Sequence, residues 1–127
     1  MKYCIISILI CRFAGGYDKI HGGYLEDAAL SLSGGIYDII VDGEVVPKFN
    51  NGGDKDKVTQ ILNWGEARLD SSAFRGCSNM QIIATDILIT RANISSAFQQ
   101  CTVLTGNTSM TNWDTSLVNF AQNTFAS

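Results

Sequence analysis

The sequence predicts an α/β fold, in which a short β-solenoid of the leucine-rich-repeat type follows an N-terminal β-rich cap. Two observations predict it: a motif that recurs at a spacing of 24 residues in the second half, and β-branched, glycine-punctuated segments in the first third. Leucine-rich repeats have periods of about 20–29 residues and combine one strand with a short helical turn. We expect a cap over residues 1–47 and a solenoid over residues 48–127, with an incomplete last repeat.

The repeat is carried by the motif Ser-Ser-Ala-Phe, which occupies residues 71–74 and again residues 95–98. A cysteine follows each phenylalanine after three residues, and a large apolar residue follows each cysteine after three more. A third, partial copy is Asn-Thr-Phe at residues 123–125. One repeat cannot bury its apolar positions alone, so equivalent side chains should stack in a core. The expected pairs are Phe74 with Phe98, Cys77 with Cys101, and Met80 with Leu104.

Each repeat should contain a short strand and a single helical turn. The serine hydroxyls that precede Ala-Phe can cap such a turn. Strands are expected at residues 58–62, 80–84 and about 103–110. A disulfide between stacked cysteines lies within reach of the expected spacing. Stacked side chains point in parallel, however, and cysteine is a good small core residue, so buried thiols are the expectation.

A β-hairpin is expected just before the repeats. Residues 36–41 alternate between the two faces of a strand, and Asp42-Gly43 suits a type I′ turn. Residues 36–41 and 44–49 are therefore predicted to pair antiparallel.

Two further N-terminal segments are open to more than one interpretation. Residues 1–11 are rich in isoleucine, which favours a strand. A targeting segment is the alternative, because the apolar region of a signal peptide can be this short. Residues 25–32 are compatible with one helical turn or with a strand.

Composition and charge exclude several classes of function. The chain is 46% apolar with a net charge of −3, and its lysines and arginines form no run, so nucleic-acid binding is not expected. No apolar run approaches the roughly 20 residues that a membrane-spanning helix needs. The four cysteines and one histidine form no ligand pattern, so we expect neither a metal nor a cofactor.

No set of catalytic side chains can be recognised, so the protein is not expected to be an enzyme. His21 stands alone, with no nucleophile and acid spaced around it. Asn50, Asn51, Asp54 and Asp56 could offer oxygen atoms to calcium. Their spacing does not match an EF-hand, and a solvated turn is the simpler interpretation.

Several short segments are typical of one family. They are residues 48–55 (Lys-Phe-Asn-Asn-Gly-Gly-Asp-Lys), 63–65 (Asn-Trp-Gly), 73–80 (Ala-Phe-Arg-Gly-Cys-Ser-Asn-Met), 84–86 (Ala-Thr-Asp) and 112–116 (Asn-Trp-Asp-Thr-Ser). With these segments, residues 48–127 resemble the BspA-like leucine-rich-repeat surface proteins. The chain departs from the family pattern at Leu117, Phe120 and Ala121, and its last repeat lacks the cysteine. The resemblance implies an extracellular or cell-surface adhesive protein without catalytic residues.

Two classes of function follow. The first is a non-catalytic protein-binding or adhesive surface module of the BspA-like type. The second is a structural subunit of a larger assembly, such as a virion or filament, which would place the protein in a virion. In both, the expected partner is a protein, either a different one or a second copy, bound by the solenoid surface or by its open C-terminal end.

The candidate partner-binding residues are aromatic. The incomplete last repeat leaves Phe120 and Phe125 without a following residue to cover them, and exposed apolar ends favour association. Trp113 is the third candidate. Trp64 and Trp113 could also stack on sugars, although packing in the core or at its rim is the simpler interpretation.

Overall fold

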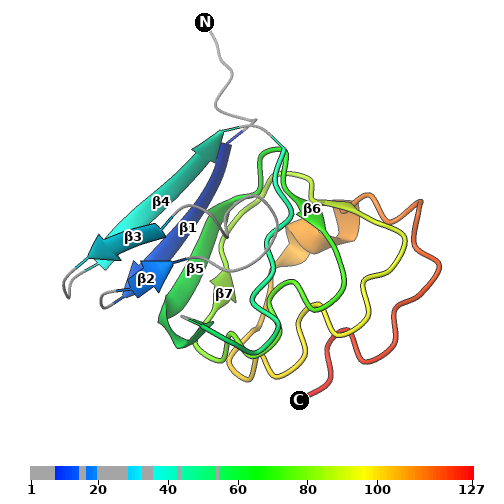
Figure 1. Ribbon diagram of the computed structural model, residues 1–127. Helices are drawn as coiled ribbons and strands as arrows, with labels where there is room; N and C mark the ends of the chain where they lie inside the picture. The colour runs from blue at the N-terminus through cyan, green and yellow to red at the C-terminus, as the bar shows by residue number, and fades with distance from the viewer. Residues whose placement is uncertain (1–7, 15–16, 20–28, 33–35, 43, 54) are drawn as a thin grey trace, which may run out of the picture.

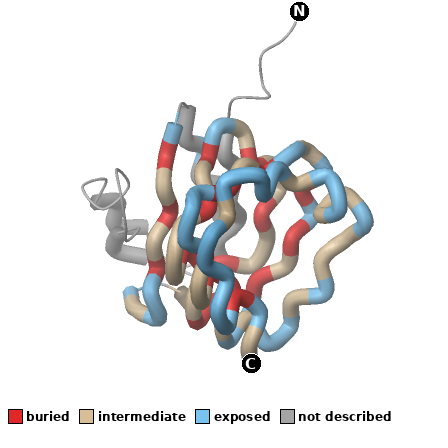
Figure 2. The backbone as a smooth tube through the Cα atoms, turned by 90° about the vertical axis from the view of Figure 1, so that its right-hand side faces the viewer, coloured by how far each residue is buried: buried red, intermediate tan, exposed pale blue. Residues whose placement is uncertain are grey.

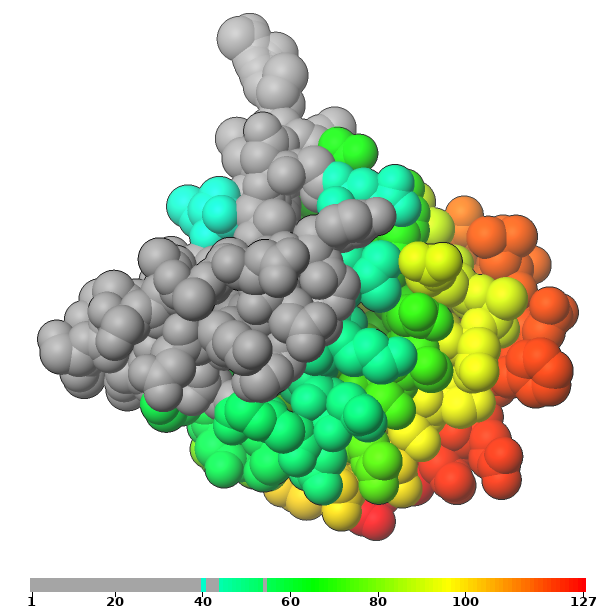
Figure 3. Space-filling view, in the orientation of Figure 1, coloured from blue at the N-terminus to red at the C-terminus, as the bar shows by residue number. Residues whose placement is uncertain are grey.

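Figure 1 shows the computed structural model of the chain, which describes all residues except 1–7, 15–16, 20–28, 33–35, 43 and 54. The N-terminal strands lie on one side of the molecule. The second half of the chain winds beside them in successive turns that end at the C-terminus. Figure 3 shows these turns as bands in chain order.

The main sheet joins the N-terminal third to the start of the repeat region. Its strands, in order across the sheet, are β4 (Ile36–Asp42), β1 (Ile8–Ala14), β5 (Val58–Asn63) and β7 (Gln81–Ile82). Strand β1 is antiparallel to β4 and β5, whereas β5 and β7 are parallel. Isoleucine and valine recur in the longer strands because branched side chains pack well on a pleated surface. One sheet therefore contains strands from both sides of the predicted boundary at residue 47.

Two smaller sheets and two short helices complete the regular structure of the described residues. Strands β2 (Tyr17–Lys19) and β3 (Ala29–Leu32) are antiparallel, and β6 (Arg68–Leu69) and β8 (Ile89–Thr90) are parallel. The 3₁₀ helices are η3 (Lys55–Lys57) and η4 (Thr108–Asn112). Asn107 caps η4, because its side-chain oxygen accepts a hydrogen bond from the Ser109 amide at 2.9 Å.

The predicted α/β leucine-rich-repeat solenoid is wrong. The described residues contain no α-helix, and their parallel strands pair over only two residues each, so the protein is a small, mostly β domain. Backbone conformation explains the missing helical turns. Ser72 and Ser96 have φ angles of 56° and 61°, in the left-handed region that interrupts a right-handed helix. The serines that were expected to cap a helical turn prevent it instead.

The repeated segments nevertheless lie side by side. The amide of Phe74 donates to the carbonyl of Ala97 at 2.7 Å, and the amide of Ser72 donates to Ser95 at 2.9 Å. As predicted, Phe74, Phe98, Cys77 and Met80 are buried. Their equivalents Cys101 and Leu104 are only partly buried and pack against the edge of the core. Cys77 and Cys101 form no disulfide with each other, and the expectation of buried thiols is confirmed for Cys77, whereas Cys101 is partly buried.

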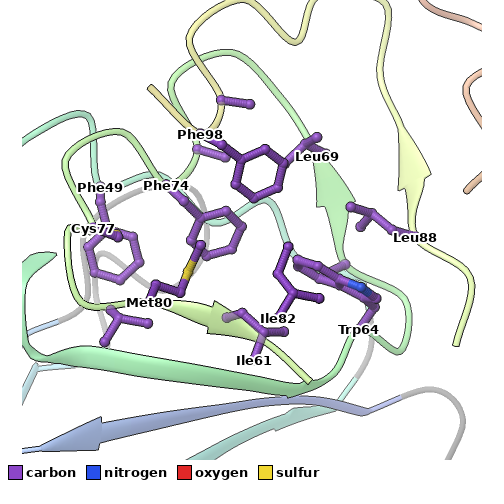
Figure 4. Close-up of a cluster of buried hydrophobic side chains, with 14 of the residues drawn as sticks. Phe49, Ile61, Trp64, Leu69, Phe74, Cys77, Met80, Ile82, Leu88 and Phe98 are labelled. Carbon is purple, nitrogen blue, oxygen red and sulfur yellow. The ribbon is translucent and has the colours of Figure 1, made fainter. Parts of the chain in front are cut away.

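The buried side chains form one cluster between the main sheet and the turns. Figure 4 shows Phe49, Phe74 and Phe98 in series. The fully buried members with the largest side chains are Trp64, Phe74, Phe98, Ile61, Leu69, Met80, Leu88, Val45 and Val58. Because these residues come from successive turns of the chain, burial of their apolar area stabilises the turns against one another.

The predicted hairpin is wrong in its second half. Strand β4 forms as expected, but its partner is β1, with Phe13 opposite Tyr37. With the described residues, residues 44–49 form one parallel bridge, between Val45 and Ala67. Their backbone bonds to the next turn instead, since the amide of Phe49 donates to the carbonyl of Ala73.

The other predicted strands form in part. Residues 58–62 lie in β5, as expected, whereas only two of residues 80–84 form β7. Residues 103–110 contain no strand, and η4 begins there instead. Gly106 has a φ of +67°, which is incompatible with a continuous strand.

Some expectations lie wholly or partly outside the described residues. Of residues 1–11, those from 8 onward belong to β1, and the rest are outside. Of residues 25–32, those from 29 onward form β3, which favours the strand interpretation for that part. His21, Gly43 and Asp54 are outside the described residues.

Candidate partner-binding surface

The last turn of the chain closes one end of the stack, and Figure 2 looks onto it. It is held to the preceding turn by backbone hydrogen bonds. The amides of Asn119 and Phe120 both donate to the carbonyl of Ala92, and the amide of Phe98 donates to Thr124. Thr124 replaces the alanine found at residues 73 and 97, and its hydroxyl lies 2.7 Å from the Ala121 carbonyl. The last turn is therefore an ordered layer of the fold.

The structure places two of the three predicted residues on the surface. Phe120 is 63% exposed and Phe125 is 59% exposed. Both belong to the last turn, which Figure 1 draws in red. Aromatic residues are enriched at protein interfaces relative to the rest of the surface.

Phe125 is the last member of a series of stacked rings. Its ring lies 5.3 Å from that of Phe98, at an interplanar angle of 10°. The rings of Phe98 and Phe74 follow at 5.7 Å and 8°, and those of Phe74 and Phe49 at 6.0 Å and 29°. One face of Phe125 is thus covered by Phe98, while the side chain remains largely exposed.

Trp113 has a different role from the two exposed rings. It is partly buried and packs edge-on against Trp64, with ring centroids 5.8 Å apart and an interplanar angle of 90°. It also packs against Phe98 at 5.9 Å. Trp64 is fully buried. The two indoles therefore pack within the core or at its rim, as the simpler interpretation of the sequence held.

Leu117 is a surface residue that the sequence analysis did not propose for partner binding. It is 62% exposed and also belongs to the last turn. The signal was a leucine directly after the polar residues Asp-Thr-Ser at 114–116. The next residue, Val118, packs against the core and so takes the buried position. We refer to Leu117, Phe120 and Phe125 together as the C-terminal surface.

The C-terminal surface lies in an almost uncharged part of the chain. Asp114 is the only charged residue among residues 92–127. Hydrogen bonds from Ser116, first from its hydroxyl and then from its backbone, lower the pKa of the Asp114 carboxyl. Proteins commonly protect exposed edges with lysines or other charges. Within residues 92–127, Asp114 is the one side chain that could protect an edge in this way.

A shallow groove of about 430 Å³ lies elsewhere, between residues 81–85 and 105–109. Side-chain amides line it and bond to the backbone. The Asn107 side chain donates to the carbonyls of Ile82 and Ala84 at 3.1 Å, and Gln81 accepts from the Thr105 amide at 3.0 Å. The bonds from Asn107 thus satisfy the carbonyls of Ile82, in β7, and of Ala84, just after it.

The described residues contain no cluster of three or more His, Cys, Asp or Glu side chains suited to a metal ion. In the segment considered for calcium, Asn50 and Asn51 adopt left-handed φ angles of 48° and 61°. The Asp56 carboxylate is bonded to Lys55 at 3.0 Å, an interaction that lowers its pKa.

Comparisons with known proteins show no relative. No protein-family model matches the chain, and neither a curated protein nor a solved structure matches it. Within the described part of the chain, no helix has the length and apolar character needed to cross a membrane.

Proposed function

We propose that this protein is a non-catalytic, adhesive protein-binding module whose C-terminal surface contacts a partner protein. The observation that carries the proposal is the exposure of Leu117, Phe120 and Phe125 on a single turn. Exposed aromatic residues over a well-packed base are typical of interface centres, because they bury a large area with little loss of side-chain entropy. The resemblance of residues 48–127 to BspA-like proteins supports an extracellular or cell-surface location.

The packing beneath the surface supports the same proposal. Phe125 is held against Phe98, which is itself fully buried, so the exposed ring is presented on a rigid base. A preorganised anchor loses less entropy on binding than a side chain in a loose segment.

Site-specific photocrosslinking in the cells that make the protein tests the proposal. A photoreactive phenylalanine analogue replaces Phe120, and the matched control places it at Ile40, which is 61% exposed in β4 on the other side of the molecule. We expect one discrete adduct with a different protein from position 120, none from position 40, and loss of that adduct in Leu117→Lys. Equal adducts from both positions would contradict the proposal. Adducts between copies of the chain alone would also contradict it and would favour the structural-subunit alternative.

A further inference from the structure

The peptide groups along the phenylalanine series all point the same way. The amide of Phe49 donates to the carbonyl of Ala73 at 2.7 Å. The Ala73 carbonyl and the Phe74 amide belong to one peptide group. The amide of Phe74 donates in turn to the carbonyl of Ala97 at 2.7 Å. In a trans peptide the carbonyl and the amide point in opposite directions. Each peptide group therefore accepts a hydrogen bond from the preceding turn and donates one to the following turn. This chain of aligned peptides continues through Phe98, whose amide donates to Thr124 at 2.8 Å.

Two further chains of peptides run parallel to the first. In one of them, the amide of Ser72 donates to the carbonyl of Ser95 (2.9 Å) and that of Ser96 to Gln122 (3.0 Å). In the other, the amides of Asn51, Gly76 and Gln100 donate to the carbonyls of Arg75 (2.7 Å), Gln99 (2.9 Å) and Ala126 (2.7 Å), respectively. In all three chains the amides point toward the C-terminal end of the stack. Aligned peptide dipoles add, as they do in an α-helix, and hydrogen-bonded amides polarise one another.

The last amides of these chains are those of Asn123, Phe125 and Ser127. The carbonyls of residues 122, 124 and 126 accept from the preceding turn, so the amides of the same peptide groups point away from it. No described residue accepts a hydrogen bond from the amide of Asn123 or Phe125. These three alternate amides form a row of backbone donors, which we call the donor edge.

The polarity of the donor edge restricts what can cover it. Two copies that met symmetrically through this edge would oppose amide to amide, and backbone hydrogen bonds could not form. Stacking of a second copy head to tail is also unfavourable, because the ring at the other end of the series, Phe49, is only 3% exposed. The complementary partner is a different polypeptide that offers acceptors.

We propose that the donor edge binds an extended segment of a partner protein that presents backbone carbonyls at alternate residues and places an aromatic ring over Phe125. This inference rests on the proposed function and specifies the partner's chemistry. Each turn of this protein already meets the next in that way, through carbonyls at residues 95, 97 and 99 or 122, 124 and 126. The nearly charge-free sequence after residue 91 fits an uncharged partner segment.

A tethered segment tests the donor edge directly. A copy of residues 92–104, which supplies the acceptor row and its phenylalanine, is joined to residue 127 through a flexible Gly/Ser linker that gives a high effective concentration. We expect amide hydrogen exchange at Asn123 and Phe125 to slow by about tenfold, the effect of a hydrogen bond worth about 1.4 kcal/mol. The matched control tether carries alanine in place of its phenylalanine and should protect these amides less.

Two variants separate the backbone from the ring. Phe125→Ala removes the ring and keeps the amide donor, whereas Phe125→Pro removes both, and circular dichroism checks that each variant folds. Protection of Asn123 by the tether should be reduced in Phe125→Ala and lost in Phe125→Pro. Unchanged exchange at Asn123 and Phe125 in the tethered protein would overturn the inference. A tether that raises Tm without protecting these amides would also overturn it, yet would leave the photocrosslinking test of the proposed function unaffected.

Discussion

The ring of Phe98 lies parallel to that of Phe74, with centroids 5.7 Å apart and an interplanar angle of 8°. These two residues occupy the same position in consecutive copies of Ser-Ser-Ala-Phe. Equivalent residues of the sequence repeat therefore stack their rings in the structure, although the turns that contain the repeat are not helical. This stack also connects the core to the exposed ring of Phe125.

Phe98→Ala should lower the free energy of unfolding by about 3–5 kcal/mol, because the side chain is buried between two rings and its loss leaves a cavity. Phe125→Ala is the matched control, since that residue is mostly exposed. A urea titration measures both. A loss below about 1 kcal/mol for Phe98→Ala would show that the stack does not stabilise the fold.

Gly76→Ala should destabilise the protein by roughly 1–2 kcal/mol or more, because an L-residue is strained at a φ of +85° and the added Cβ would collide with the Asn51 side chain. Gly52→Ala is the control: there a Cβ would lie 3.5 Å from the Phe49 carbonyl, an ordinary contact. Thermal unfolding should show a clear fall in Tm for the first variant and little change for the second. Equal Tm values would contradict the left-handed turn at Gly76.

Asp86→Ala should cost roughly 1–3 kcal/mol, because the carboxylate accepts from the amides of Trp64 and Gly65 at 2.9 Å each and its removal leaves both without an acceptor. Asp86→Asn keeps one acceptor oxygen and should cost less. Denaturant titrations of the two variants provide the test. The reverse order of stability would show that these hydrogen bonds do not hold the turns together.

The thiol of Cys101 should react slowly with alkylating reagents at pH 8.5. Burial raises its pKa from 9.0 to about 11, so the thiolate fraction in the folded protein is lower by a factor on the order of 100. The same shift contributes stability that is present below pH 9 and is lost as the pH rises toward 11. Alkylation followed by peptide mass mapping, with urea-unfolded protein as the reference, measures the rate. Equal rates in both states would contradict the burial of this thiol.

Part of the core could be predicted from the sequence. The spacing of 24 residues identified Phe74, Phe98, Cys77 and Met80 as buried residues, because stacked segments must bury equivalent positions. The same reasoning identified Phe120 and Phe125 as surface residues, and both are exposed. It missed Leu117, whose neighbour Val118 takes the inward position.

The sequence by itself determined which residues repeat, which side chains stack and where charge is absent, because these properties follow from spacing and residue type. Only the tertiary structure decided the partner of β4 and the conformation of the turns. Strand β4 pairs with β1 because residues 44–49 bond to the next turn through Phe49. Ser72 and Ser96 adopt left-handed angles, and their own amides donate to the carbonyls of Ser95 and Gln122 in the next turn. Those bonds join residues more than twenty positions apart, and local propensity does not encode them.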